Sequence, residues 1–228
     1  MKFIKYNVSN TLIIRDLGIQ PYEKVAKAMD IFTKNRIFSS IDELWFVQHF
    51  PIYTRGVSKK CQLENILIPN KIPIIQSNRG GGITYHGPGQ QIMYILLDLR
   101  RKIFTVRHVI MLLKQTIISV LSHFSINSYF INDFPGFYVY GKKICSLGLR
   151  INKGCLSHGI ALNVMMDLTP FTYIHPCGNI GIRMTQMKHY VFIQDAKEII
   201  PIFLKKFFFF FRITHSMIKP WDDTKYEM

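Results

Sequence analysis

The chain has 228 residues, of which 48% are hydrophobic and 19% charged. That composition excludes a disordered tail and predicts a folded protein with a substantial core. The formal net charge is +15, which fits an acidic partner such as nucleic acid, an anionic membrane surface or an acidic carrier protein. It fits equally well the compositional drift of AT-rich coding, because the basic residues are scattered and form no long block.

The cysteines exclude several kinds of site. They are Cys61, Cys145, Cys155 and Cys177. No CxxC pair occurs, so no zinc-ribbon pattern is present and we expect no metal. This cysteine density is low for a disulfide scaffold, which predicts a reducing, cytoplasmic location. No run of 18 apolar residues occurs, so we expect no membrane insertion.

The first half of the chain alternates strand and helix patterns. Residues 11–15 and 43–49 predict strands, and residues 22–36 predict a helix that begins after Pro21. Residues 66–76 predict two short extended pieces around a Pro-Asn turn. Residues 79–91 predict a glycine-dense loop.

The second half is rich in short strands. A buried strand is predicted over 92–99, and a helix over 106–124, where apolar residues recur every three or four positions. The further predictions are strands over 136–139, 143–149 and 159–164, turns over 166–180, and a helix over 194–211 with a kink at Pro201. We therefore predict an α+β fold in one domain, residues 1–228, with 195–228 as a helical C-terminal end. The run Phe207–Phe211 is expected to belong to that helix, with a membrane-surface contact as the alternative.

The loop that begins at Arg79 has three consecutive glycines followed by Ile83, Thr84, Tyr85 and His86. Glycines allow the backbone to approach a ligand closely. The segment lacks the GK[ST] of a phosphate-binding loop and is not a dinucleotide fingerprint. Polar side chains beside the glycines favour ligand contact over a plain strand connection.

Cys177 lies between Pro176 and Gly178, in a sequence typical of a sharp turn that exposes a thiol. A thiolate is a nucleophile, and a nearby cation lowers the thiol pKa. The candidate cations are His86, Lys142, Lys143, His158 and His175. The alternative is that Cys177 is a small buried apolar residue, and that Lys143 is a solvated turn residue.

Four stretches together resemble the lipoyl(octanoyl) transferase family. They are IDELWFVQHFPIYTRG (41–56), RGGGITYHGPGQQIMYILLDLR (79–100), GKKICSLGLRINKGCLSHGIALNV (141–164) and DLTPFTYIHPCGNIGIRMTQM (167–187). The likeness covers roughly residues 12–190. Gly82 stands where the family more often has Gln or Asp, and the Phe207–Phe211 run has no counterpart.

The resemblance implies a mixed β-sheet flanked by helices, related to the biotin and lipoate protein ligases. It implies an acyltransferase of the lipoate pathway that needs no cofactor. Octanoyl (or lipoyl) would pass from acyl carrier protein to an enzyme cysteine, and then to a lysine of an apo lipoyl domain. The implied acceptors are the 2-oxoacid dehydrogenase complexes and the glycine cleavage H protein, and a monomer is expected.

The resemblance also assigns roles to residues. The acyl-carrying cysteine falls on Cys177, and the lysine that lowers its pKa and moves protons falls on Lys143. The implied substrate-binding residues are Arg79, Gly80, Gly81, Gly82, Ile83, Thr84, Tyr85, His86, Ser146, Leu147, Gly148, Gly159, Ile160 and Ala161. The alternatives are an ATP-dependent lipoate or biotin ligase of the same fold, and a basic nucleic-acid-binding protein, although no nucleic-acid-binding motif is present.

Overall fold

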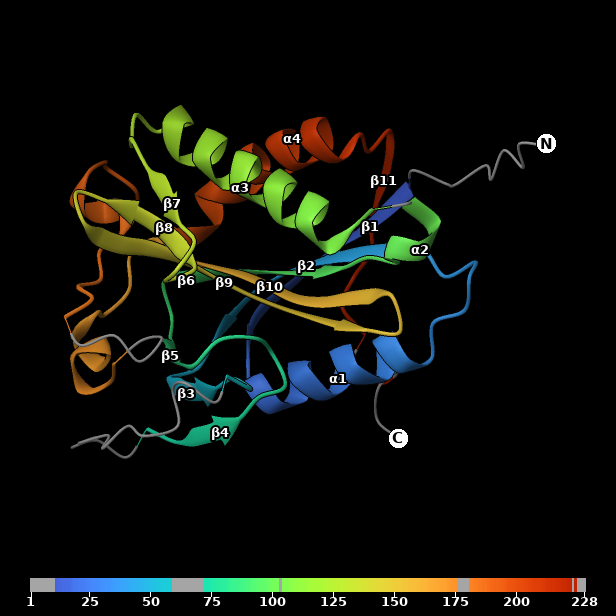
Figure 1. Ribbon diagram of the computed structural model, residues 1–228, viewed down its shortest axis with the longest axis horizontal. Coiled ribbons are helices and arrows are strands. Elements are labelled where there is room, and N and C mark those ends of the chain that lie inside the picture. The colour runs from blue at the N-terminus through green and yellow to red at the C-terminus, as the bar shows by residue number, and fades with distance from the viewer. Residues whose placement is uncertain (1–10, 59–71, 103, 176–180, 223, 225–228) are drawn as a thin grey trace.

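The computed structural model describes residues 11–58, 72–102, 104–175, 181–222 and 224 (Figure 1). The strands are β1 (Thr11–Gln20), β2 (Asp42–His49), β3 (Ile52–Arg55), β4 (Ile74–Gln76), β5 (Ile83–His86), β6 (Gln90–Leu96), β7 (Tyr129–Ile131), β8 (Gly136–Val139), β9 (Lys142–Asn152), β10 (Cys155–Asn163) and β11 (His215–Ile218). The α-helices are α1 (Tyr22–Lys34), α2 (Leu99–Lys102), α3 (Val106–His123) and α4 (Ile199–Phe211). Short 3₁₀ helices are η2 (Thr169–Tyr173), η4 (Met187–His189) and η5 (Ala196–Glu198).

Two sheets organise the part of the chain that the structure describes. The large sheet has eight strands in the order β11-β1-β2-β6-β10-β9-β8-β7. β1 is parallel to β11 and β2, and the other neighbours are antiparallel. The small sheet, β4-β3-β5, contains one parallel and one antiparallel pair. The predicted mixed sheet of an α+β fold is thus confirmed.

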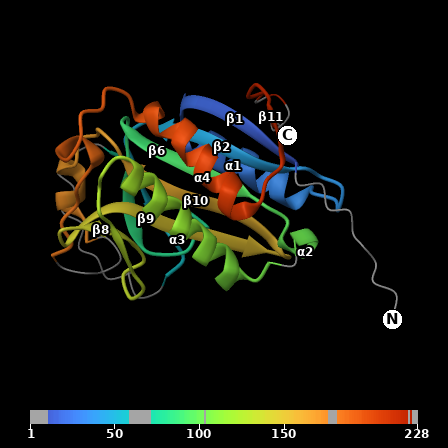
Figure 2. The same ribbon diagram turned by 90° about the horizontal axis from the view of Figure 1, so that it is seen from above.

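Helices cover both faces of the large sheet. Figure 1 shows α3 and α4 on one face, with α1 and the small sheet on the other, and Figure 2 shows α3 and α4 side by side. The core under α3 and α4 contains residues from both helices and the inner faces of β2, β6, β9 and β10. A separate cluster joins α1 to the opposite face around Trp45. The large sheet is therefore buried on both faces, which agrees with the continuous apolar runs of β2 and β6.

The predictions for α1 and α3 are confirmed to within two residues at their ends, whereas α4 begins at Ile199 and not at residue 194 as predicted. α1 begins directly after Pro21 and buries Tyr22, Val25, Ala28 and Met29. Thr105 is the N-cap residue of α3, and its side chain accepts a hydrogen bond from the His108 N–H at 3.1 Å. Its buried residues are those of the predicted apolar stripe. Amphipathic periodicity therefore located both helices correctly.

The phenylalanine run lies in α4, as expected. Phe203, Phe207 and Phe211 are buried on one face and stack in sequence, with ring centroids 5.6 and 4.1 Å apart. Phe209 points outward and is 74% exposed. Pro201 is the third residue of the helix, in the first turn, where a missing N–H removes no intrahelical hydrogen bond. The proline therefore gives no cause for the kink that was expected at Pro201.

Two local predictions differ from the structure. The predicted loop 79–91 contains strand β5, which pairs with β3. The C-terminal end is only partly helical, since β11 pairs with β1. Of the extended pieces predicted over 66–76, residues 66–71 lie outside the described residues, and β4 forms at Ile74–Gln76. No helix in the described ranges is long and apolar enough to cross a membrane.

Candidate functional site

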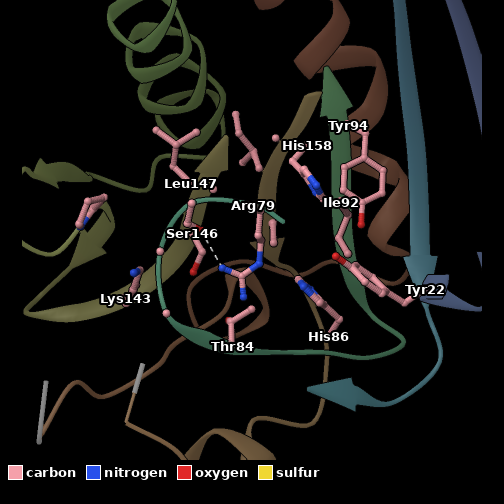
Figure 3. Close-up of a pocket in the computed structure, with 18 residues that line it drawn as sticks. Tyr22, Arg79, Thr84, His86, Ile92, Tyr94, Lys143, Ser146, Leu147 and His158 are labelled. Atoms are coloured by element: carbon pink, nitrogen blue, oxygen red, sulfur yellow. Dashed lines mark hydrogen bonds between the residues drawn. The ribbon is translucent and has the colours of Figure 1, made fainter. Parts of the chain in front are cut away.

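A cavity opens on the α1 side of the large sheet, between the glycine loop and strands β6, β9 and β10 (Figure 3). Its walls combine apolar side chains with a few convergent polar groups, the usual character of a small-molecule site. The lining residues are Tyr22, Arg79, Gly80, Gly81, Gly82, Thr84, His86, Ile92, Tyr94, Pro135, Lys143, Ser146, Leu147, Gly148, His158, Gly159, Ile160 and Ala161.

The fold brings most of the predicted site residues together at this cavity. The predicted substrate-binding residues all line it, except Ile83 and Tyr85. Successive side chains of a strand point to opposite faces, so Thr84 and His86 of β5 face the cavity. Ile83 and Tyr85 pack instead in a cluster with Tyr53 and Phe171. These two side chains therefore lie away from the cavity wall, and substrate binding by them stays a prediction.

Arg79 is held by hydrogen bonds within the protein. Its guanidinium donates to the backbone oxygen of Thr54 at 2.7 Å, to Thr54 Oγ1 at 2.9 Å and to the Gly80 oxygen at 2.9 Å. The Gly80 N–H in turn donates to the Leu149 oxygen at 3.0 Å. Arg79 therefore joins the glycine loop to β3, and Gly80 joins that loop to β9.

His86 belongs to a buried chain of hydrogen bonds that continues from Arg79. Thr54 Oγ1 lies 3.3 Å from His86 Nε2, and His86 Nδ1 lies 2.7 Å from Gln90 Oε1. Gln90 Nε2 donates to Asn163 Oδ1 at 2.9 Å, and Asn163 Nδ2 donates to the Thr185 oxygen at 3.0 Å. The chain links the glycine loop to the segment that follows residues 176–180.

Burial keeps the histidines around the cavity uncharged. Desolvation, together with the charge of Arg79, lowers the pKa of His158 to about 3. Desolvation, then His49 and Arg79, lowers the pKa of His86 well below its ordinary value. Desolvation lowers the pKa of His49 to about 4. None of these rings can supply the cation that a reactive thiol needs.

Lys143 is the buried member of the Lys142-Lys143 pair. Its side chain is 1% exposed and lines the cavity, whereas Lys142 faces solvent. The interpretation of Lys143 as a solvated turn residue is therefore wrong. Its backbone N–H donates to the Arg183 oxygen, and its carbonyl accepts from the Thr185 N–H, both at 2.8 Å. These bonds attach the segment after residues 176–180 directly to Lys143.

The cysteines have different environments. Cys177 and Cys61 lie outside the described residues. Burial raises the pKa of the Cys145 thiol, and the charge of Lys143 opposes that effect only in part. Burial, then Asp98, raises the pKa of Cys155. Cys145 and Cys155 are thus suited to packing rather than to nucleophilic chemistry, and the described residues contain no group of metal-ligating side chains.

Several lining residues escaped the sequence reasoning as site residues. Tyr22, Ile92, Tyr94 and Pro135 line the cavity, and His158 was predicted only as a cation. Ile92 and Tyr94 belong to a strand of apolar composition, where no local feature separates wall residues from core residues. The Tyr22 hydroxyl lies 2.7 Å from Ser77 Oγ, and its ring stacks on His86 at 6.0 Å. Tyr22, a tyrosine at the first position of a helix, was the one feature of the sequence that could have indicated a site residue.

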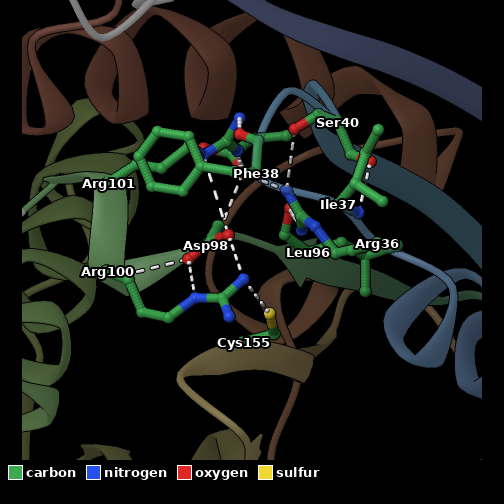
Figure 4. Close-up of polar contacts among 10 residues, drawn as sticks. Arg36, Ile37, Phe38, Ser40, Leu96, Asp98, Arg100, Arg101 and Cys155 are labelled. Carbon is green, nitrogen blue, oxygen red and sulfur yellow. Dashed lines mark hydrogen bonds and ion pairs between the residues drawn. The ribbon is translucent and has the colours of Figure 1, made fainter. Parts of the chain in front are cut away.

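A second buried polar cluster lies at the other end of β6 and braces the scaffold (Figure 4). Asp42 accepts from Arg36 at 2.5 Å and also from Arg101. Asp98 binds Arg100 at 2.6 Å. Burial by itself would raise the pKa of Asp98, but the hydrogen bonds and the charge of Arg100 outweigh burial, so the Asp98 pKa is lowered. These bonds tie the end of α1 to β2 and α2. None of these residues lines the cavity.

Comparisons with known proteins agree on the family. The model of the lipoyl protein ligase A/B catalytic domain matches residues 20–208. The chain is 48% identical to an octanoyltransferase of Sodalis glossinidius over 219 residues, covering 96% of this chain and 99% of that one. It is 54% identical to an octanoyltransferase of Klebsiella pneumoniae subsp. pneumoniae over 181 residues, covering 79% of this chain and 84% of the relative.

Solved structures share the fold at low sequence identity. A lipoate-protein ligase A bound with ATP superposes with a TM-score of 0.76 at 14% identity, covering 95% of this chain and 91% of the other. A putative lipoate protein ligase of T. acidophilum with bound lipoic acid gives 0.75 at 14% identity, covering 93% and 91%. A biotin protein ligase of Aquifex aeolicus in complex with biotin and ATP gives 0.56 at 15% identity, covering 88% and 70%.

Proposed function

The chain belongs to the octanoyltransferase family, whose members are acyltransferases with a lipoyl protein ligase A/B catalytic domain, and on that premise we propose that it transfers octanoyl through a thioester on Cys177. The observation that carries the proposal is Lys143. A lysine that is 1% exposed in the wall of a cavity, and bonded through its backbone to the segment after Cys177, is suited to proton transfer.

The first half-reaction moves the acyl group onto the enzyme. Neutral Lys143 takes the Cys177 thiol proton, and the resulting ammonium stabilises the thiolate. The thiolate attacks the carbonyl carbon of the donor thioester, and the tetrahedral intermediate expels the donor thiolate. Lys143 then returns its proton to that leaving sulfur. One thioester replaces another, so the step is nearly isoenergetic and needs no ATP.

The second half-reaction moves the acyl group onto the acceptor. The lysine amine of an apo lipoyl domain attacks the octanoyl-Cys177 carbonyl carbon, an amide forms and the Cys177 thiolate leaves. Lys143 accepts the proton that the amine loses and delivers it to the thiolate. Backbone N–H groups near Cys177 and in the glycine loop are the proposed donors to the oxyanion, with the exception of the Gly80 N–H, which is bonded to the Leu149 oxygen.

The cavity walls support an acyl substrate. Ile92, Leu147, Ile160 and Ala161 offer apolar surface along β6, β9 and β10. Each buried CH₂ of an octanoyl chain would contribute about 0.8 kcal/mol. We propose that the chain occupies this space with its carbonyl carbon at the Lys143 end.

The partners follow from the reaction. We propose octanoyl-acyl carrier protein as donor and apo lipoyl domains as acceptors, among them those of the 2-oxoacid dehydrogenase complexes and the glycine cleavage H protein. The net charge of +15 would attract an acidic carrier. Cytoplasmic location, a monomeric state and independence of any cofactor stay predictions.

Intact-protein mass after incubation with octanoyl-acyl carrier protein, without ATP, tests the mechanism. We expect one octanoyl adduct on the unaltered protein and none on Cys177→Ser. Cys155→Ser, which changes a buried thiol away from the cavity, is the matched control and should keep the adduct. An adduct of undiminished yield on Cys177→Ser would refute the thioester on Cys177, and formation only with ATP would favour the ligase reaction.

Lys143→Ala tests the proton carrier separately. We expect the rate of adduct formation to fall by about 10²- to 10⁴-fold, the usual contribution of a positioned general base. Circular dichroism should show that the variant remains folded. A fall in rate of less than about twofold, far smaller than that range, would exclude Lys143 from this role.

A further inference from the structure

Lys143 faces the cavity only because the strand that carries it is irregular. In β9, Ser146 and Gly148 line the cavity, whereas Cys145 lies in the core under α3 and α4 and Leu147, which also borders the cavity, packs against that core. Side chains alternate along a strand, so Lys143 would share the face of Cys145 if β9 were regular. That face is the apolar core, where a lysine would be buried among aliphatic and aromatic side chains.

A one-residue bulge reverses the alternation. In the pairing of β8 with β9, Phe137 lies opposite Cys145, but Tyr138 lies opposite Lys143. Ile144 is the extra residue, and it joins Cys145 in the same core although the two are consecutive. Bulges re-aim side chains in this way and are frequent beside active sites. The bulge thereby turns Lys143 from the core to the cavity.

Gly136 provides the space that the turned side chain occupies. A Cβ atom at Gly136 would lie 2.2 Å from Lys143 Cε, 2.9 Å from Lys143 Nζ and 2.7 Å from the Cys145 backbone oxygen. These distances are far below van der Waals contact. Lys143 therefore lies directly across the Cα of Gly136, and any larger residue there displaces its amino end.

Tyr138 lies on the same side of β8. Its ring centroid is 5.9 Å from Lys143 Nζ, within the range of a cation–π contact. The ring is buried, and its hydroxyl donates to the Phe134 oxygen at 2.9 Å, which fixes the ring in place. Phe137, between the two, points into the opposite core and packs on Phe130.

We propose that Gly136 and Tyr138 are positioning residues for Lys143, which together with the Ile144 bulge hold its amino group at the reacting thiol. Gly136 fixes where the side chain lies, and Tyr138 stabilises its ammonium form. This inference rests on the proposed function, because it concerns the lysine that moves the proton there.

A double-mutant cycle tests Gly136. We expect Gly136→Ala to slow octanoyl-Cys177 formation from octanoyl-acyl carrier protein on the order of 10²-fold, the cost of misplacing a reacting group by about 1 Å. In a Lys143→Ala background the same change should slow the remaining rate far less, because only the contact with the Cys145 oxygen then persists. Phe137→Leu, on the neighbouring residue but the opposite face, controls for loosening of β8 and should not show this dependence on Lys143.

The pH dependence of acylation tests Tyr138. Without the ring the ammonium form is less stable, so neutral Lys143 is available at lower pH and Tyr138→Leu should move the acid limb of the pH–rate profile to lower pH. Tyr138→Phe keeps the ring and should restore the limb, although it loses the hydrogen bond to Phe134. A purely structural role would lower the rate without moving the limb.

The outcomes separate this inference from the function on which it rests. If Gly136→Ala slows acylation equally with and without Lys143, or if Phe137→Leu shows the same coupling, Gly136 supports the sheet and the inference is wrong. An unmoved acid limb in Tyr138→Leu overturns the role of the ring. Absence of any octanoyl adduct on the unaltered protein would instead refute the proposed function, whatever the variants do.

Discussion

Individual glycines in this site serve different purposes, although the sequence presents them alike. Gly159 and Gly148 lie directly opposite each other in the pairing of β10 with β9, and both line the cavity. A Cβ at Gly159 would lie 1.9 Å from the Met93 backbone oxygen, whereas a Cβ at Gly148 would meet Arg79 Cδ at 3.3 Å. Gly159 is thus required for the contact between β10 and β6.

Substituting the two glycines one at a time should show that they contribute differently to stability. Gly159→Ala forces two backbones apart, and we expect a loss of about 1–3 kcal/mol in the free energy of unfolding. Gly148→Ala should cost about 1 kcal/mol or less, since the lower entropy of the unfolded chain offsets the tighter contact. Urea unfolding followed by circular dichroism measures both. Equal losses for the two variants would contradict the assignment of Gly159 to strand contact.

At the scale of an element, α4 explains the unusual phenylalanine run. Its buried face continues the stack Phe203–Phe207–Phe211 over the core that also supports β6 and β10. Phe209 lies on the outer face between Lys205 and Arg212, which are also exposed. The run is therefore one buried stripe with exposed neighbours, as the helical period requires.

The two faces of α4 should respond differently to truncation. Phe207 is fully buried, so Phe207→Ala should lower the free energy of unfolding by about 3–5 kcal/mol. Phe209→Ala is the matched control on the same helix, and because the ring is 74% exposed we expect a change within about 0.5 kcal/mol. Denaturant midpoints compare the two, and a large loss for Phe209→Ala would show that its ring is covered in solution.

For the whole molecule, the buried histidines make stability depend on pH. The folded-state pKa of His49 is about 4 and that of His158 about 3, both lowered chiefly by desolvation. The pKa of His86 is lowered for the same reason. An unfolded chain protonates these rings below about pH 6.5. The unfolded state then binds more protons than the folded state, so stability falls as the pH drops from about 6.5 towards 4.

Urea unfolding at several pH values measures this linkage. Each neutral histidine should contribute a slope of up to about 1.4 kcal/mol per pH unit below pH 6.5. His158→Asn should remove one such contribution, since asparagine tolerates the left-handed backbone, with φ of +61°, found there. Constant stability between pH 7.5 and 5 would contradict the buried neutral rings.

By itself the sequence determined the local elements and the family. The apolar periods of α1 and α3 and the strands β2, β8 and β10 follow from interactions between near neighbours, which a linear pattern records. The glycine loop and the segments around Lys143 and Cys177 indicated the kind of chemistry. Thr84 and His86 line the cavity and Ile83 and Tyr85 do not, a division that the sequence did not predict because the strand character of β5 depends on its pairing with β3.

Only the tertiary structure decided which side chains meet. Burial of Lys143 depends on the Ile144 bulge, on Gly136 in the neighbouring strand and on the bonds to Arg183 and Thr185. The neutrality of His86 and His158 depends on desolvation by elements distant in sequence. Such properties arise from long-range pairing, which no spacing along the chain records. They place Lys143, which resembles a turn residue in the sequence, in the wall of the cavity.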